Sequence, residues 1–404
     1  MKKMIALTLA LMLLLCACSA GRDNQASAVP ETAAETTAEP TTEPTTEPTT
    51  EPSTEPTTEP PPVYFNPING QILDEPFDGR IYAVSIANTN DASIPHLNAY
   101  RADMIMEMFV NNSVVRWLGL YTNFADVEAI GSTRSTRLMF NDIAEHYNLV
   151  LAHAGGTGRV IRDANSRGIT HFNVDSLMRQ GDPLSQGTAY RSKEYPKQKY
   201  GEYNLFTIGA GVMAYAEAQG VPLTGMPETD YGFVFQEDGT PVSGEIADEI
   251  TVTLTYGKAR KDTTMVYNRE CGTYECHQYG KAMTDLATGT SEAFENVVVM
   301  LANISRRDEY HVADFVAGGT GYFACGGRII PMTWTCESEL SPFRFFTEDG
   351  EPLAFGQGKT YIAICSPESA VVWSEIIPPE TVSETVAETV AETVSETVSE
   401  TAAE

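Results

Sequence analysis

Two low-complexity segments confine any folded core to the middle of this 404-residue chain. Residues 18–62 repeat Thr-Thr-Glu-Pro, and residues 374–404 repeat Glu-Thr-Val followed by Ala or Ser. The first segment is an extended tether, because it has almost no apolar side chains to bury. Valine at every fourth position of the second segment allows a helix, but the abundance of Thr and Val favours a disordered acidic tail. About 310 residues remain between them, enough for two domains with cores of their own.

The first residues have the pattern of a lipoprotein signal. Lys2 and Lys3 precede an apolar run over residues 5–15, which is too short to span a membrane as a helix. Leu, Cys, Ala and Cys follow at positions 15–18, the order found at a lipoprotein processing site. We therefore predict a signal peptide over residues 1–17 and lipidation of Cys18, which would anchor the protein to the outer face of the cell membrane. An ordinary signal peptide is the alternative.

The net charge of −29 is concentrated partly in the low-complexity segments. Residues 22–62 hold nine acidic side chains and residues 375–404 hold eight. Without these segments and the signal, the chain carries about −15, still acidic enough to argue against nucleic acid or anionic lipid as a general partner.

Residues 131–158 are the most informative part of the middle region. A helix is predicted there, because one apolar stripe has the spacing i, i+3, i+4, i+7 and consists of Phe140, Ile143, Ala144 and Tyr147. Ser132 and Thr133 are expected to cap it. Residues 127–130 and 149–152 would be the flanking strands, parallel and joined by a right-handed crossover. Both following loops would then meet at the carboxyl edge of the sheet, where open sheets bind ligands.

The pattern of strands changes along the chain. In the first half we predict a strand over 81–87, a hairpin over 104–110 and 114–121, and helices over 160–166 and 209–219. The second half alternates polar and apolar residues over 251–256, 264–267, 296–302, 322–324, 329–335 and 360–365. The sequence thus predicts an α+β protein, with a mixed α/β domain containing a parallel crossover at 70–222 and a mostly antiparallel β domain at 228–373.

Arginines and glycines mark a candidate ligand site in the two loops. Arg134 and Arg137, three residues apart, would share a face at the helix start beside the hydroxyls of Ser132 and Thr133. Guanidinium groups and free backbone N–H groups at a helix start are suited to a phosphate or carboxylate. We expect Gly155, Gly156 and Arg116 to belong to the same site. The alternative is that the arginines pair with acidic side chains such as Asp103 or Glu107.

Catalysis has weaker support. His153 could act as a general acid or base near neutral pH, with Glu107 as a carboxylate beside it, but a histidine bonded within the core is an equal explanation. The loop after His153 lacks the lysine of a P-loop and the glycine spacing of a dinucleotide fold, and the chain has no nucleophile-elbow or zinc-protease motif. Whether the protein is an enzyme stays open.

The five cysteines that follow Cys18 have no zinc-module spacing. A disulfide between Cys271 and Cys276 or between Cys325 and Cys336 is one reading, and scattered thiols are the other. We predict no metal site and no cofactor.

The middle region carries four short motifs: Gly-Ser-Thr-Arg-Ser-Thr-Arg at 131–137, Ala-His-Ala-Gly-Gly at 152–156, Gly-Thr-Gly-Tyr at 319–322 and Gly-Lys-Thr-Tyr-Ile at 358–362. In combination they resemble the YerB-like lipoproteins, a family of unknown function in Gram-positive bacteria. The resemblance covers roughly residues 79–367 and implies a surface lipoprotein with two linked domains, but no activity. The family tends to have a Gly-x-x-His-x-Asp motif. Here Met283 replaces that histidine, which leaves Gly280 and Asp285 as turn residues.

The sequence is compatible with two functions. The first is a tethered protein of the cell envelope that binds an anionic small molecule or cell-wall polymer. The alternative is a hydrolase or transferase that acts on cell-wall material through His153 and Glu107. The absence of a nucleophile–base motif favours binding.

Overall fold

The computed structural model describes residues 62–376 except 90–93, 95, 195–202 and 225–228. The predicted signal peptide, Cys18, the tether and nearly all of the acidic tail lie outside the described residues. Within them, no helix is long and apolar enough to cross a membrane.

The first half of the described chain contains all the helices that the structure shows. Its elements are β1 (Tyr64–Phe65), β2 (Ile72–Leu73), β3 (Tyr82–Ala87), the 3-10 helix η1 (Ala99–Arg101), β4 (Met104–Asn111), β5 (Val114–Tyr121), β6 (Ile130–Gly131), α1 (Leu138–His146), β7 (Val150–His153), α2 (Gly158–Ser166), β8 (His171–Asn173), α3 (Val174–Leu177), α4 (Pro183–Gln186), β9 (Ala189–Arg191), β10 (Leu205–Thr207) and α5 (Gly209–Ala218).

The second half is built of strands. They are β11 (Val234–Gln236), β12 (Glu245–Ile246), β13 (Glu249–Tyr256), β14 (Ala259–Asn268), β15 (Thr273–Gln278), β16 (Lys281–Ala282), β17 (Ala293–Phe294), β18 (Asn296–Leu301), β19 (Asn303–Arg307), β20 (Tyr310–Asp314), β21 (Gly319–Cys325), β22 (Arg328–Thr335), β23 (Arg344–Thr347), β24 (Ala354–Gly356), β25 (Thr360–Cys365) and β26 (Ala370–Ser374). The described chain is therefore mostly β with few helices.

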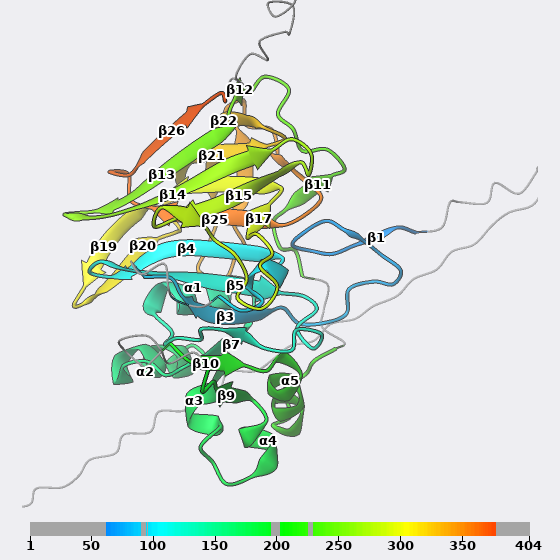
Figure 1. Cartoon of the computed structure of the whole chain (residues 1–404), viewed down its shortest axis with the longest axis vertical. Coiled ribbons are helices and arrows are strands. Elements are labelled where there is room, and N and C mark those ends of the chain that lie inside the picture. Colours follow the sequence, from blue (N-terminus) through cyan, green and yellow to red (C-terminus); the bar gives the residue numbers. More distant parts are fainter. Residues whose placement is uncertain (1–61, 90–93, 95, 195–202, 225–228, 377–404) are drawn as a thin grey trace, which may run out of the picture. The chain divides into compact units, whose positions relative to one another are not determined.

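One 11-stranded sheet runs through both halves of the chain (Figure 1). Its order is β12-β22-β21-β18-β25-β4-β5-β3-β7-β8, with β23 beside β22. β25 is the strand that joins the halves, because it pairs in parallel with β18 on one side and with β4 on the other. The two halves thus share backbone hydrogen bonds as well as side-chain contacts.

A second sheet of six strands contains β16-β15-β14-β13-β26, with β17 beside β15. All its pairs are antiparallel. Smaller sheets complete the fold: β6-β10-β9 has three strands, and β1-β2, β11-β24 and β19-β20 have two each.

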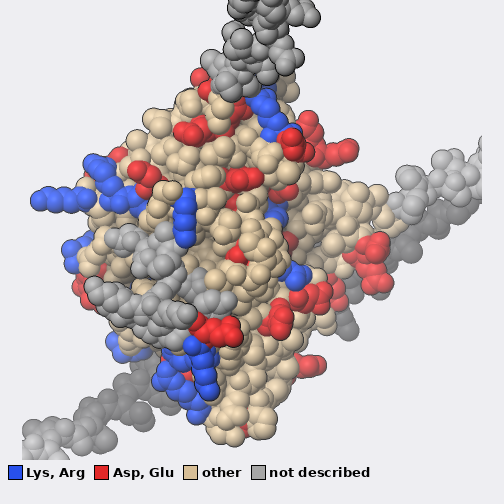
Figure 2. Space-filling model, viewed as in Figure 1, with Lys and Arg blue, Asp and Glu red and all other residues tan. Residues whose placement is uncertain are grey.

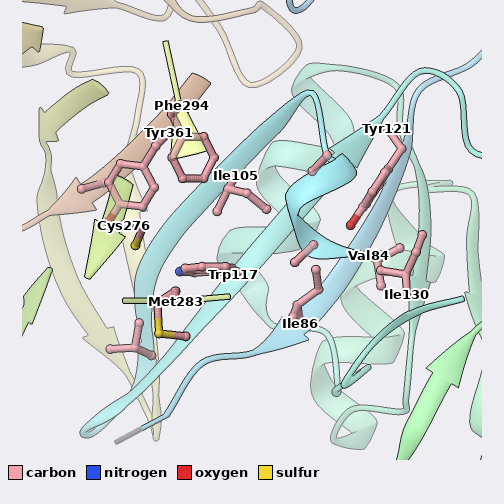
Figure 3. Packing of buried hydrophobic residues seen from close by; sticks show 14 of the residues in the cluster. Val84, Ile86, Ile105, Trp117, Tyr121, Ile130, Cys276, Met283, Phe294 and Tyr361 are labelled. Atoms are coloured by element: carbon pink, nitrogen blue, oxygen red, sulfur yellow. The ribbon is translucent and has the colours of Figure 1, made fainter. Parts of the chain in front are cut away.

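The central strands are buried on both faces, which separates the core into two clusters of apolar side chains. Along β3, Val84 and Ile86 belong to one cluster and Ala83 to the other, as expected when successive side chains point to opposite faces. The first cluster includes Trp117 of β5 and Cys276 of β15 (Figure 3). It also includes buried apolar side chains of β13 and β14. The second includes the buried stripe of α1 and the aromatic side chains around β22 and β23.

Several local predictions are confirmed. The hairpin forms as β4 and β5, the strand over 81–87 as β3, and the six strands of the second half as β13, β14, β18, β21, β22 and β25. The predicted stripe of α1 is buried. Gly280 has φ +79, and Asp285 accepts hydrogen bonds from the backbone N–H groups of Ala287 and Thr288, so both are turn residues.

The predicted crossover is wrong in its first strand. Residues 130–131 form β6, which pairs antiparallel with β10 in the three-stranded sheet. β7 pairs in parallel with β3 on one side and with β8 on the other, so α2 lies on the crossover that the structure forms. Capping by Ser132 and Thr133 is also wrong, because the N-cap of α1 is Arg137.

The disulfide alternative is contradicted, since Cys271, Cys276, Cys325, Cys336 and Cys365 are all free thiols. Four of them are buried and Cys271 is exposed. Burial raises the pKa of Cys325 and of Cys336 to about 11, so these thiols stay protonated near neutral pH.

Candidate functional site

Residues 132–136 cross the ends of β3 and β7 and hold the candidate site in place. Ala87 N–H donates to the Ser132 carbonyl and Arg134 N–H to the Ser85 carbonyl, both at 2.8 Å. On the other side, Ala154 N–H donates to the Arg134 carbonyl at 2.8 Å. This segment therefore fills the space where the two parallel strands diverge, at their carboxyl ends.

All three predicted site arginines line one cavity of about 280 Å³, named here the arginine pocket. Arg116 comes from β5, while Arg134 and Arg137 come from the segment before α1. The other lining residues come from the end of β3, the β4–β5 hairpin and the segment before β10: Ala87, Asn88, Thr89, Asn111, Val114, Val115 and Tyr203.

Main-chain and aromatic groups are among the contacts of the three guanidinium groups. Arg116 donates to the Ser135 carbonyl, and Arg137 Nη1 donates to the Thr136 carbonyl at 2.7 Å. The Arg134 guanidinium lies over the Tyr203 ring, 4.8 Å from its centroid. Burial, opposed by Tyr310 and helped by the charge of Arg134, lowers the pKa of Arg137 to about 10, so its side chain remains cationic at neutral pH.

Three residues that line this pocket each have a buried polar atom for which the described part of the chain shows no hydrogen-bond partner: Arg137 Nε, Asn88 Oδ1 and Asn111 Oδ1. Buried polar groups in folded proteins are nearly always paired, so such atoms require an explanation. Three guanidinium groups around one cavity, with the unpaired Arg137 Nε among their donors, are what a site for an anion would provide.

The other predicted ligand residues do not line the arginine pocket. Thr133 is buried, and its hydroxyl is bonded to Thr207 Oγ1 at 2.8 Å; Ser132 is also buried. The Gly155 carbonyl accepts from Thr136 N–H at 2.9 Å, and Gly156 lies against Ile161. These residues shape the loops that carry the arginines.

His153 is fully buried and engaged at both ring nitrogens. Nδ1 is 2.8 Å from the Gly155 carbonyl, and Nε2 is 3.0 Å from Nδ1 of His171. Burial, together with the neighbouring His171, lowers the pKa of His153 to about 3, so the ring is neutral near pH 7. His153 therefore has the geometry of the bonded core histidine.

Glu107 lies at the centre of a buried network between the two large sheets. Its carboxylate forms an ion pair with Lys261 Nζ at 2.5 Å. The other donors to it are Thr263 Oγ1 at 2.6 Å, Trp117 Nε1 at 3.0 Å, Gln278 Nε2 at 3.1 Å, the Asn88 amide and the Tyr361 hydroxyl. Burial by itself would raise the pKa of Glu107, but Lys261 and these hydrogen bonds hold the pKa below its usual value.

The structure does not bring Glu107 and His153 together. They belong to β4 and β7, which are separated in the sheet by β5 and β3. Three strand spacings correspond to about 14 Å. Asp103, the other predicted carboxylate, accepts from Asn69 Nδ2 at 2.5 Å and from Thr122 N–H at 2.7 Å.

Charges elsewhere are mixed. On the face shown in Figure 2, basic and acidic side chains of the described residues are interspersed, so that face presents no continuous basic surface. Among the same described residues, no group of three or more His, Cys, Asp or Glu side chains is arranged to hold a metal ion.

Sequence reasoning missed Asn88, Asn111 and Tyr203 as pocket residues. Asn88 directly follows the strand predicted over 81–87, so its place at a carboxyl strand end was a usable signal. Tyr203 offered no such signal, because it reaches the pocket from a segment about 70 residues beyond Arg134, and this approach depends on the tertiary fold.

The same fold and the same two domains occur in known proteins. Residues 70–222 match the family described as "Protein of unknown function (DUF3048) N-terminal domain", and residues 252–362 match the C-terminal domain of that family. The crystal structure of the YerB protein from Bacillus subtilis is similar with a TM-score of 0.63 and 19% identity, over 76% of this chain and 99% of that one. No curated protein matches the chain. The chain therefore belongs to the DUF3048 family of YerB-like proteins.

Proposed function

We propose that the protein is an extracytoplasmic lipoprotein, anchored through Cys18, that binds an anionic ligand of the cell envelope or its surroundings in the arginine pocket. The observation that carries the proposal is the convergence of Arg116, Arg134 and Arg137 on one cavity, where the buried Nε of Arg137 has no hydrogen-bond partner. Guanidinium groups remain charged in such sites and match the oxygen geometry of phosphate and carboxylate groups.

Binding is favoured over hydrolysis by the same geometry. A general base must reach the proton that it abstracts, with a pKa near the working pH. His153 is neutral, buried and bonded at both nitrogens, and Glu107 is fixed in an ion pair. The charged and amide side chains that line the pocket are arginines and asparagines, which can orient and hold a ligand.

A double variant, Arg134→Gln with Arg137→Gln, tests the site in purified protein. Wild type should be stabilised by a bound anion by about 2.7 kcal/mol at a hundredfold excess over Kd, measured by thermal shift with phosphate, sugar acids and peptidoglycan fragments. The double variant should stay folded and lose this stabilisation. Arg162→Gln is the matched control, because Arg162 is an exposed arginine of α2 outside the pocket.

Two results would contradict the proposal. One is equal stabilisation of wild type and double variant by the same anions. The other is a double variant that unfolds while no anion stabilises wild type, since this would make the arginines structural members of the core.

The anchor has its own test. Cys18→Ala should abolish fatty-acid labelling and leave the precursor unprocessed or release the protein, because the lipid is attached to that sulfur. Labelling of the variant at the level of wild type would show that the anchor is elsewhere or absent.

A further inference from the structure

The orientation of the Asn88 side chain is fixed by its neighbour. Asn88 is 1% exposed, and its Nδ2 donates to Oε1 of Glu107. An ionised carboxylate accepts hydrogen bonds and cannot donate them. The amide therefore cannot be reversed, and its oxygen must be the end that is turned away from Glu107.

That oxygen is an acceptor without a donor. Asn88 lines the arginine pocket, and its Oδ1 is buried and unpaired. No arginine donates to this oxygen in the structure, and the anionic group of a ligand offers only acceptors, so a ligand could pair with it only through a hydrogen-bond donor of its own. Asn111, the last residue of β4, also lines the pocket and has a second unpaired amide oxygen.

We infer, resting on the proposed function, that the ligand is a hydroxylated anion: a phosphate or carboxylate that carries a hydroxyl group on a neighbouring carbon. The arginines hold the anionic group, and the hydroxyl donates to Asn88 Oδ1. Polyol phosphates and sugar acids share this chemistry. The hydrogen bond to Glu107 fixes the Asn88 amide in the orientation that accepts from the ligand hydroxyl.

Two matched pairs of probes test the inference by calorimetry on the purified full chain. Glycerol 3-phosphate is compared with n-propyl phosphate, and glycerate with propanoate, so that each pair differs only in hydroxyl groups. Wild type should bind the hydroxylated member about tenfold more tightly, because the other member leaves a buried acceptor unpaired. The pair that binds more tightly identifies the anionic group as phosphate or carboxylate.

Substitutions test whether the pocket asparagines cause the preference for the hydroxylated probe. Asn88→Ala should bind the two members of a pair alike while retaining affinity for the unhydroxylated anion. Asn111→Ala should reduce the preference and leaves every hydrogen-bond donor to Glu107 in place. This variant therefore tests the inference even if Asn88→Ala fails to fold. Asn123→Ala, an exposed asparagine outside the pocket, should keep the full preference.

The outcomes separate this inference from the proposed function. Equal binding of both members by wild type would overturn the inference while the anion site stands. An undiminished preference in both Asn88→Ala and Asn111→Ala would also overturn it. Binding of none of the four probes, together with no anion-dependent stabilisation, would remove the proposed function as well.

Discussion

Glu107 and Lys261 form a buried ion pair, and the side chain of each is almost completely removed from water. Replacing one partner leaves the other charge buried without compensation, at a cost of about 3–5 kcal/mol. Lys261→Met should therefore lower the free energy of unfolding by that amount in urea titrations. The double variant Glu107→Gln with Lys261→Met should recover part of the loss, since it leaves no unpaired charge.

The control for this prediction is an ion pair in solvent. Arg179, 63% exposed, pairs with Asp175 four residues earlier in the chain, and Arg179→Gln should cost less than about 1 kcal/mol. If Lys261→Met and Arg179→Gln had similar effects, the Glu107 network would contribute little to stability.

Glu292 makes stability depend on pH. It is fully buried, neither carboxyl oxygen has a partner, and its nearest ion-pair candidate is His96 Nδ1 at 3.9 Å. Burial, and then the nearby charge of Asp285, raises the pKa of Glu292 to about 8. The folded state thus holds a proton that the unfolded state releases near pH 4.5, and the free energy of unfolding must fall as pH rises between these values.

Buried histidines act in the opposite sense at lower pH. Burial lowers the pKa of His96 and of His146 to about 4, so stability rises with pH until the unfolded histidines become neutral near pH 6.5. Between pH 6.5 and 8 Glu292 dominates. There we expect a fall of about 1.4 kcal/mol per pH unit, measured by urea titration, and a flat profile in Glu292→Gln. A wild-type profile that is already flat would contradict the buried neutral acid.

Part of the arginine pocket could be predicted from single residues of the sequence. Arg134 and Arg137 were found because a cluster of arginines and hydroxyls beside a strand end is visible in the sequence. The role of Glu107 was not, because its counter-charge is 154 residues away and no local pattern predicts that pairing. His153 was ambiguous for the same reason: burial, which decides its chemistry, depends on neighbours such as His171.

Among the elements, β25 is the one on which the arrangement of the others depends. Its six residues are all buried between β18 and β4. Ile364→Ala should cost about 2–5 kcal/mol, because it opens a cavity in a core that has no room to collapse. Val372→Ala on β26 is the control: Val372 is 60% exposed, and the change should cost about 0.5 kcal/mol or less. Chemical denaturation of both variants decides this, and a small effect at Ile364 would mean that β25 is not a central strand.

Local sequence patterns predicted the helices and strands that form from local interactions. Alternation and turn residues found the β4–β5 hairpin and the strands of the second half, and helical spacing found the buried stripe of α1. The strand at 130–131 was assigned to the wrong partner because an apolar run shows burial without showing which strand lies beside it. The close approach of β10 explains the glycine at position 131. A Cβ there would lie 2.9 Å from the Leu205 carbonyl oxygen and 2.9 Å from Phe206 Cδ1.

The whole molecule is organised by a sheet that neither half of the chain completes. β4 lies at the edge of the strands that the first half contributes to this sheet. Its neighbour on that side is β25 of the second half. Trp117, in the first half, packs in the cluster that contains Cys276 and Tyr361 of the second (Figure 3). Sequence analysis could not predict this connection, because parallel pairing between strands about 250 residues apart leaves no mark in either strand's pattern.

Because the two halves share one sheet and one core, we expect them to unfold together. A fragment of residues 62–222 would expose the unpaired edge of β4 and the apolar face that now packs against the six-stranded sheet, so we expect it to remain unfolded when expressed alone. The full chain should unfold in urea in one transition, with coincident fluorescence and circular dichroism curves. Two separate transitions, or a folded fragment with the stability of the full chain, would show that each half has a self-sufficient core.

Cleavage in the segment between the halves gives the sharpest form of this test. A protease site inserted near Pro222, between α5 and β11, cuts one covalent bond but none of the β4–β25 hydrogen bonds and none of the shared core. The two fragments should therefore migrate together in gel filtration and separate only in denaturant, with Ile364→Ala lowering the urea concentration at which they part. Insertion of the same site without cleavage controls for the loop itself. Fragments that separate in buffer after cleavage would show that the shared sheet does not hold the halves together.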